Sequence, residues 1–445
     1  MKIPTNIKEL MQKLIDEGFE AYIVGGAVRD HLLGIEPHDY DLFSNATGED
    51  ILKIFPNGNI LGGEERQKKI LTVIVDGVEI SQFRKSGDRT ETGTTLVDHQ
   101  WTCDFYINAL AIDINSQFCG DATIQSCGIR DINRRALRFV GSAEERIEED
   151  KLRILRGLRF MLKYKLSPDS DTYRYLTNTS LADLPVERIR EEFIKLLEYK
   201  ESIKLLHDYG ILKQIVLELY HPNHFESGGE HHDETPFEHM IGAFKHSCVI
   251  TTDYRIKIAT LLHDIGKGET REEKTDGGYS FHDHDNIGAE IAERILTRLK
   301  FSKDDITFIT TLIKRHMFGY MDDIQDKTYV KFYAELESKG ISIYDYLMVV
   351  YCDRQANLKK IRDKFGDFCK MSNEKFLLYH YNRIKSKNYP FSIKDLQISG
   401  KDLLELGMKP GPKIGETLRE IYDLVMEGEL KNARPELLYY IKTGE

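Results

Sequence analysis

Short apolar runs bounded by turn residues dominate the chain up to about residue 140. Within this part, a helical turn over Val28–Leu33 stops at Gly34, and Asp76–Gly77 is a two-residue hairpin signal. Strands are predicted over Tyr22–Val24, Ile70–Val75 and Val78–Phe83, and near Asn108–Ile114. The pattern predicts an αβ head.

From Ala143 onward the apolar positions recur at a spacing of three and four, as in Leu152, Leu155 and Leu158. Strand signals are then scarce. Two turn signals interrupt the helical pattern, at Gly228–Gly229 and at Gly407–Pro412, and a helix is expected over Ile414–Met426. The domains expected are a head over 1–140, a helical neck and body over 141–226, a metal-binding helical domain over 227–360 and a helical tail over 361–445.

Composition fits a soluble protein of roughly three domains, with 445 residues, 41% hydrophobic and 30% charged. No apolar run approaches the roughly 20 residues of a membrane span, and the start Met1–Pro4 lacks a signal-peptide core. We expect a cytoplasmic protein with no membrane partner. The six cysteines show no Cys-x-x-Cys pair, which suits a reducing compartment, and are expected to be buried. The net charge is −11, but positive charges outnumber negative ones from Arg354 onward, which is compatible with local RNA contact and equally with a solvated helical surface.

The chemistry with the strongest signal combines Gly25–Gly26 with Asp39 and Asp41. On a strand, side chains at i and i+2 point to the same face, so the two carboxylates could hold one or two divalent cations. Hard oxygen ligands beside a glycine turn favour magnesium and nucleoside triphosphate chemistry. The alternative to a metal site is an ordinary acidic turn exposed to solvent.

The order Gly-Gly, Arg29, Asp-x-Asp resembles the polymerase-beta superfamily of nucleotidyltransferases, and within it the bacterial class II tRNA CCA-adding enzymes and poly(A) polymerases. The resemblance implies an α+β fold with a polymerase-beta-like head and an all-helical neck, body and tail. It implies that Asp39 and Asp41 bind Mg²⁺, and that Gly25, Gly26 and Arg29 contact the triphosphate.

Two further segments of the head carry the resemblance. Glu79 stands where the superfamily keeps a third carboxylate, although an exposed glutamate on an edge strand is an equal alternative. Asp104–Leu110 resembles the motif that contacts ribose and triphosphate, which assigns Asp104 and Asn108 to the nucleotide. Thr102 and Cys103 stand where two arginines are expected, so one triphosphate clamp is missing or is supplied elsewhere.

The segment Glu149–Phe160 is expected to form one helix that shows Asp150 and Arg153 on a single face. Cytosine and adenine each present an amino donor beside a ring-nitrogen acceptor, which an Asp and an Arg match, whereas uracil and guanine present the reverse order. The pair could therefore select C and A without a nucleic-acid template, and Arg156 and Arg159 are also assigned to the nucleotide. An ordinary salt-bridged helix face is the alternative.

A second constellation follows the order of the HD phosphohydrolase superfamily. Imidazole and carboxylate ligands on packed helices suit a divalent metal, here magnesium, manganese or nickel, that activates water for phosphoester hydrolysis. A core histidine with a carboxylate partner is the alternative for an isolated His-Asp doublet. The expected ligands are His239, His263, Asp264, His284, His316 and Asp353.

The resemblance implies addition of CCA to tRNA 3′ ends from CTP and ATP, with phosphohydrolase activity in the helical part. A CC-adding or A-adding partial enzyme is an alternative, because the segment between Arg84 and Asp104 is short. Poly(A) polymerase is disfavoured by the absence of a Gly-Arg-Arg-Phe signature near residues 62–70. An HD phosphohydrolase whose head only binds RNA or nucleotide is the alternative of another class. Lys401, Lys409 and Lys413 in the tail could bind tRNA phosphates or belong to a plain helix-turn-helix unit.

Overall fold

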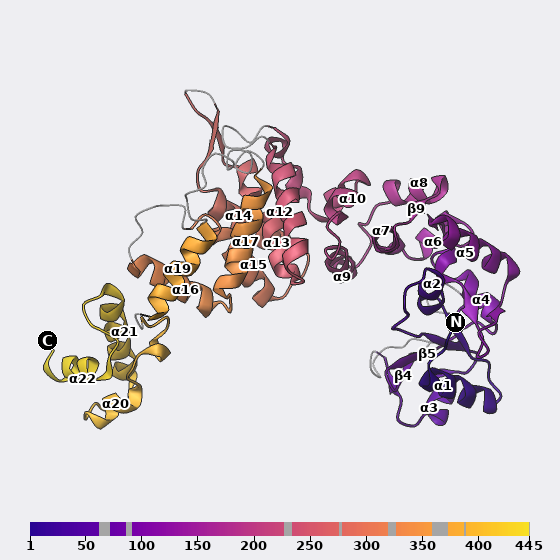
Figure 1. Cartoon of the computed structure of the whole chain (residues 1–445), viewed down its shortest axis with the longest axis horizontal. Coiled ribbons are helices and arrows are strands. Elements are labelled where there is room, and N and C mark those ends of the chain that lie inside the picture. Colours follow the sequence, from indigo (N-terminus) through magenta and orange to yellow (C-terminus); the bar gives the residue numbers. More distant parts are fainter. Residues whose placement is uncertain are drawn as a thin grey trace. The chain divides into compact units, whose positions relative to one another are not determined.

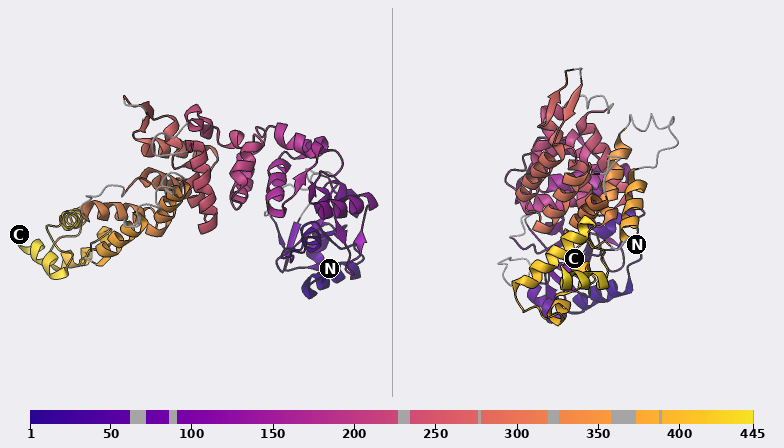
Figure 2. Two further views of the ribbon diagram at one scale, coloured as in Figure 1. Left: turned by 45° about the horizontal axis from the view of Figure 1, so that its top comes forward. Right: turned by 90° about the vertical axis from the view of Figure 1, so that its left-hand side faces the viewer.

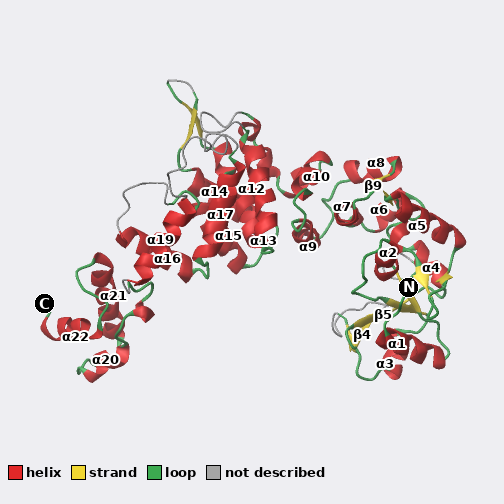
Figure 3. Ribbon diagram, viewed as in Figure 1, coloured by secondary structure: helices red, strands yellow, loops and turns green. Residues whose placement is uncertain are grey.

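Two compact units make up the chain, Met1–Gln214 and Ile215–Glu445. The computed structural model describes residues 1–61, 72–85, 91–226, 234–275, 278–318, 326–357, 373–386 and 389–444. The expected boundary at Gly228–Gly229 lies outside these residues. Strands are concentrated in the first unit, and helices dominate the second (Figure 3). No helix in the described residues is long and apolar enough to cross a membrane.

The first unit is built around a mixed sheet with the strand order β3-β4-β5-β2-β1-β6-β7, in which β2 and β5 pair in parallel. The hairpin predicted around Asp76–Gly77 is confirmed: β4 and β5 pair in antiparallel fashion, and both turn residues have positive φ. The strand expected near Asn108–Ile114 is wrong in extent, because Tyr106–Asn108 forms a 3₁₀ turn, η1, and only Ala111–Ile112 is extended. The strands are β1 Tyr22–Val24, β2 Leu42–Ser44, β3 Asn59–Ile60, β4 Thr72–Val75, β5 Val78–Gln82, β6 Ala111–Ile112 and β7 Phe118–Cys119.

Helices flank this sheet. The apolar face of α1 buries Ile7, Leu10, Met11 and Leu14, which recur at the helical spacing. This helix packs on α3, which in turn contacts β4 and β5, while α5 packs on η1 and α2. These helices are α1 Thr5–Asp16, α2 Gly26–Leu32, α3 Gly48–Ile54, α4 Leu96–Trp101 and α5 Ala122–Arg134.

The rest of the first unit is helical, with one parallel strand pair, β8 Ala136–Leu137 and β9 Ser167–Pro168. The single helix expected over Glu149–Phe160 is wrong. Asp150 is extended, with φ −158°, and separates α6 from α7. Gly157 lets α7 approach the head, because a Cβ there would lie 3.1 Å from the ring of Phe105. The helices are α6 Ala143–Glu149, α7 Arg153–Tyr164, α8 Ser170–Asn178, α9 Val186–Leu196, α10 Ser202–Asp208 and α11 Leu212–Ile215.

The second unit contains a helical bundle in which α12 packs on α13 and α17, and α15 packs on α13 and α14. Its C-terminal helices, yellow in Figures 1 and 2, have a small core of their own, and α21 packs on α16. The helix predicted over Ile414–Met426 is confirmed as α21. The elements are η2 Leu217–Tyr220, η3 Pro222–Phe225, α12 Pro236–Ile250, α13 Tyr254–Leu262, η4 Ile265–Gly268, β10 Arg271–Glu273, β11 Tyr279–Phe281, α14 His284–Arg298, α15 Lys303–Arg315, α16 Asp326–Ser338, α17 Ile343–Ala356, α19 Asn373–Ser386, η6 Ile393–Asp395, α20 Gly400–Glu405, α21 Pro412–Glu427 and α22 Arg434–Thr443.

The five described cysteines are all free thiols. Burial was expected for each, but only Cys352 is buried and the other four are partly exposed. Cys369 lies outside the described residues.

Candidate active site and metal cluster

An open cleft of about 530 Å³ lies in the first unit, between the sheet and the helices α2, α7 and α9. Most of the residues predicted for nucleotide chemistry line it. They are Gly25, Gly26, Arg29, Asp41, Glu79, Asp104, Asn108, Asp150, Arg153 and Arg156. Of the remaining predictions for the head, Asp39 and Arg159 are not among the lining residues.

Strand register brings two of the carboxylates together. Leu42 of β2 pairs with Ile80 of the parallel strand β5, so Asp41 and Glu79 stand side by side, one residue earlier on each strand. Asp39 and Asp41 were expected on a strand, but both precede β2, and Asp39 is exposed. Burial, reinforced by the charges of Glu79 and Asp39, raises the pKa of Asp41 to about 6. A buried carboxylate that resists ionisation beside a second carboxylate fits a site for a divalent cation.

The glycine turn and Arg29 form the adjoining wall of the cleft. Gly25 has φ 85° and precedes α2, and a Cβ there would lie 3.2 Å from the carbonyl oxygen of Asn108. The buried Arg29 guanidinium donates to Asp30 Oδ1 (2.8 Å), to the side chain of Asn108 and to the hydroxyl of Tyr164. Arg29 therefore joins α2 to η1 and α7, in addition to lining the cleft.

Asp104 is a buried residue of the cleft wall that accepts several hydrogen bonds. Its Oδ1 accepts from Asn108 Nδ2 (2.8 Å), and its Oδ2 accepts from Nε and Nη2 of Arg156 (2.9 and 2.7 Å). Although burial raises the pKa of Asp104, the charge of Arg156 and the Asn108 hydrogen bond lower it below its ordinary value. Burial raises the pKa of the neighbouring Cys103 thiol to about 12, and a thiol in any case offers no positive charge to a phosphate.

Asp150 and Arg153 line the same cleft, but their side chains do not pair. The Asp150 carboxylate accepts two hydrogen bonds from Arg188: Nη1 donates to Oδ1 at 3.2 Å and Nη2 to Oδ2 at 2.8 Å. The buried Arg153 guanidinium instead donates to Glu149 Oε2 (2.6 Å) and to the carbonyl oxygens of Arg146 and Thr102, both at 2.8 Å. The expected side-by-side display on one helix face is wrong, because Asp150 lies outside α7.

Arg159 does not line the cleft. Its Nε donates to Glu192 Oε2 at 2.8 Å, and this buried carboxylate on α9 also accepts from Lys195. Arg159 thus fastens α7 to α9.

Sequence reasoning missed two arginines that line the cleft, Arg84 and Arg188. Arg84 lies two residues after β5, the strand that carries Glu79, so its nearness to Glu79 in the sequence could have identified it. Arg188 is far from Asp150 in the chain, and no local motif links them.

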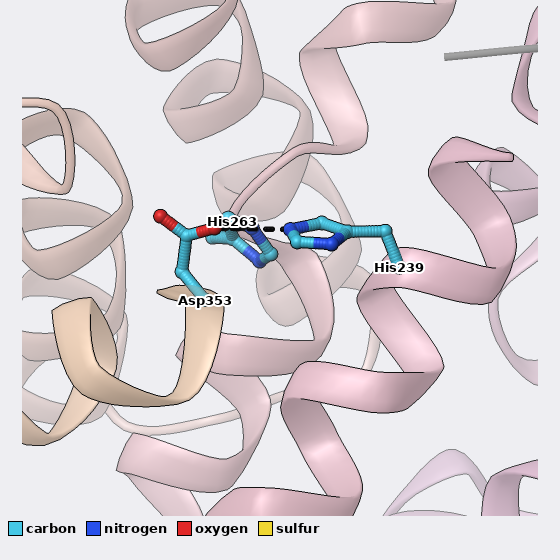
Figure 4. Close-up of side chains that lie close together, drawn as sticks. All are labelled: His239, His263 and Asp353. Carbon is cyan, nitrogen blue, oxygen red and sulfur yellow. Dashed lines mark hydrogen bonds and ion pairs between the residues drawn. The ribbon is translucent and has the colours of Figure 1, made fainter. Parts of the chain in front are cut away.

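In the second unit all six predicted metal ligands meet. They form two groups, His239 with His263 and Asp353, and Asp264 with His284 and His316; within each group the ligand atoms lie within 4.8 Å of one another. Figure 4 shows the first group, with His239 Nε2 3.0 Å from Asp353 Oδ1.

A contact at Nδ1, the ring nitrogen that faces away from the centre of the cluster, orients each of the four histidines. The Nδ1 atoms of His263, His284 and His316 lie 2.8, 2.7 and 2.6 Å from the carbonyl oxygens of Thr260, Phe281 and Ile313, and His239 Nδ1 lies 3.1 Å from Glu234. All four Nε2 atoms are thereby left to face the centre.

This centre fits a metal. The Nε2 atoms of His263, His284 and His316 are buried without a hydrogen-bond partner in the described residues. Burial lowers the pKa of His284 to about 4, which keeps it in the neutral form that metals bind. Although burial also acts on His263, the charge of Asp264 raises the pKa of His263 to about 10, so a metal would displace a proton there. The donor set of four imidazoles and two carboxylates suits a divalent transition metal or magnesium.

Three family models match successive parts of the chain: the poly A polymerase head domain at residues 21–138, a probable RNA- and SrmB-binding site of polymerase A at 175–221, and a putative tRNA nucleotidyltransferase domain 2 at 280–441. The A-adding tRNA nucleotidyltransferase of Deinococcus radiodurans is 30% identical, with 92% of both chains covered. The CCA-adding enzyme of Staphylococcus saprophyticus is 27% identical over 98% of this chain and 97% of its own.

A solved structure with the same fold covers nearly the whole chain. It is the CCA-adding enzyme of Bacillus stearothermophilus in complex with CTP, with a TM-score of 0.64 and 22% identity over 99% of this chain and 98% of its own. The fold, the three family models and the identity to the A-adding relative converge, and the chain belongs to the tRNA nucleotidyltransferase family, as a nucleotidyltransferase.

Proposed function

We propose that the chain adds C and A nucleotides to the 3′ end of tRNA, using CTP and ATP and no nucleic-acid template. The single observation that supports this most is the carboxylate pair Asp41–Glu79 beside the Gly25 turn, in a cleft that Asp150 and Arg153 also line. The names of the relatives support the same reaction.

In this proposal, Asp39, Asp41 and Glu79 would hold Mg²⁺. When bound, the metal supplies Lewis-acid stabilisation of the phosphates and of the attacking 3′ oxygen. Gly25 and Gly26 keep side chains away from the triphosphate, since backbone N–H groups at such a turn can donate to phosphate oxygens. Asp104 holds Asn108 and Arg156 in place at the nucleotide.

A more specific proposal concerns how many nucleotides the enzyme adds. We propose complete CCA addition, with A addition alone as the alternative that the Deinococcus radiodurans relative supports. Purified protein should be incubated with tRNAs that end before, within and after CCA, with each nucleoside triphosphate supplied separately. Full CCA addition predicts CTP use on the shortest tRNA and ATP use on the tRNA ending in CC. ATP use on the latter alone would reveal a partial enzyme.

The ligand cluster of the second unit supports a second function. We propose that it holds two divalent metal ions, one in each group of three ligands, and hydrolyses phosphoesters on nucleotides or tRNA ends. The metals would activate water and hold the phosphate oxygens, while Lys267, which donates to Asp264 at 2.6 Å, balances the charge of that carboxylate.

We expect His263→Ala to remove bound metal and the hydrolysis of 2′,3′-cyclic AMP but to spare CTP incorporation, because the two sites lie in separate units. The checks are metal content by mass spectrometry and phosphoesterase assays with nickel, manganese and magnesium. Wild-type protein that binds no metal and hydrolyses nothing would make the cluster structural. Loss of CTP incorporation in the folded variant would show that the two sites depend on each other.

We also propose that the C-terminal tail contacts tRNA. Lys401, Lys409 and Lys413 are exposed on α20, on the following turn and on α21, where they could contact tRNA phosphates.

A further inference from the structure

One of the four histidines of the metal cluster differs from the others in its partner at Nδ1. In His263, His284 and His316 this nitrogen faces a backbone carbonyl oxygen, which carries no net charge. In His239 it lies 3.1 Å from Oε1 of Glu234, a carboxylate whose side chain is 5% exposed. The cluster therefore contains one histidine with a charged partner at Nδ1 and three with neutral partners.

The start of α12 fixes Glu234 against His239. Glu234 directly precedes Thr235, the residue that caps this helix. The Thr235 hydroxyl accepts from the backbone N–H of Glu238 at 3.2 Å, and the Glu238 carboxylate accepts from the backbone N–H of Thr235 at 3.0 Å. The backbone N–H of His239 donates to the carbonyl oxygen of Thr235 at 2.9 Å. The ligand and the carboxylate behind it are therefore held by one capped turn.

The two groups of ligands also differ in charge. Asp264 reaches both groups, because its Oδ2 faces the imidazoles of one and its Oδ1 those of the other, and Lys267 offsets its charge. The ring of His239 lies between two further carboxylates, with Asp353 Oδ1 3.0 Å from Nε2 and Glu234 at Nδ1. The metal position beside His239 is therefore the more negative of the two, which favours a divalent cation there.

We propose that Glu234 is a positioning residue that makes the group of His239, His263 and Asp353 the tighter of the two metal positions; this inference rests on the metal cluster proposed above. A carboxylate that accepts from Nδ1–H of a metal-binding histidine fixes its tautomer and makes Nε2 a stronger ligand. A carbonyl oxygen fixes the tautomer without adding a full negative charge. The first ion therefore binds beside His239, and the second needs a higher metal concentration.

The test compares Glu234→Gln and Glu234→Ala with the wild type. Metal-stripped, full-length protein is titrated with Mn²⁺, and the electron paramagnetic resonance signal of the free ion reports binding. Glutamine keeps an oxygen that accepts from Nδ1 but removes the charge, so His239 acquires the same kind of partner as the other three histidines. We expect Glu234→Gln to weaken the tighter binding step roughly 10-fold and Glu234→Ala to weaken it up to roughly 100-fold, with the other step unchanged.

Ligand variants assign the loss to one position. In His316→Ala protein, which keeps the position beside His239, adding Glu234→Gln should still weaken Mn²⁺ binding. In Asp353→Asn protein, which keeps the other position, adding it should change nothing. Glu290→Gln is the matched control, because it removes an exposed carboxylate from α14 in the same bundle, and both binding steps should persist. Circular dichroism of each metal-stripped variant checks that it is folded.

Mn²⁺ affinities that are unchanged in Glu234→Gln would overturn the inference. An equal loss at both positions in folded protein would also overturn it, since Glu234 would then support the bundle as a whole, as would wild-type protein that binds no metal. Wild-type protein that binds two ions but hydrolyses no phosphoester would contradict the proposed hydrolysis, while the affinities would still decide the role of Glu234.

Discussion

Asp41 links the cleft to pH and to stability. Its pKa is raised from 3.8 to about 6 by burial and by Glu79 and Asp39, so the folded protein holds a proton that the unfolded chain releases. Without metal, this group therefore favours folding at low pH, and its contribution is lost as pH rises from about 4 through about 6. Asp41→Asn should stabilise the metal-free protein by roughly 1–3 kcal/mol at pH 7.5 while abolishing nucleotide addition.

Thermal melts in a chelator at pH 5 and pH 7.5 check this prediction. Asp39→Asn is the matched control: it should also impair addition, but it should raise the melting temperature less than Asp41→Asn does, because Asp39 is exposed and its charge is the smaller of the two that act on Asp41. An Asp41→Asn protein less stable than the wild type at pH 7.5 would contradict the destabilisation that we attribute to the buried charge of Asp41.

Arg159 was predicted to contact the nucleotide, but its contacts indicate a structural role between α7 and α9. Because it pairs with the buried Glu192, Arg159→Ala should destabilise the first unit by about 2 kcal/mol, with Lys195 retaining part of the charge balance. The KM values for CTP and ATP should not change. Urea unfolding and steady-state kinetics provide the measurements, and a raised KM in fully folded protein would return Arg159 to the nucleotide site.

At the level of elements, a comparison of Gly25, in the turn before α2, with Gly34 distinguishes backbone strain from a role in the site. Gly25 and Gly34 both have positive φ, but a Cβ at Gly25 would press on the carbonyl of Asn108, whereas a Cβ at Gly34 meets nothing within 4 Å. Each alanine substitution should cost about 1 kcal/mol of stability. Only Gly25→Ala should also lower kcat/KM for CTP, by roughly tenfold or more; equal activity in the two variants would refute a role for this turn in binding.

Elements with local signals were predictable from the sequence. The Asp76–Gly77 turn sets the β4–β5 hairpin because both residues adopt positive φ, and Pro412 begins α21. The break between α6 and α7 was not predictable, because no glycine or proline marks it. It depends on Asp150, whose side chain accepts the N–H of Leu152 and competes with the helix.

At the level of the whole molecule, sequence order identified the six ligands of the second unit, and the helical bundle brings them together. The same reasoning could not find Arg188, because its place beside Asp150 depends on how α9 packs against α7. Local patterns identify residues with a chemical role, whereas the partners that orient them come from packing between distant segments.

The central claim is that the first unit adds C and A to tRNA. The most direct test incubates magnesium-loaded protein with labelled tRNA lacking its terminal CCA and with tRNA ending in CC, supplying each of the four nucleoside triphosphates alone, and resolves the products to single nucleotides. The account predicts extension of the first by CTP, extension of the second by ATP, little or no extension with UTP or GTP, and no product with Asp41→Asn. Equal use of all four nucleotides, or products that persist in Asp41→Asn, would contradict it.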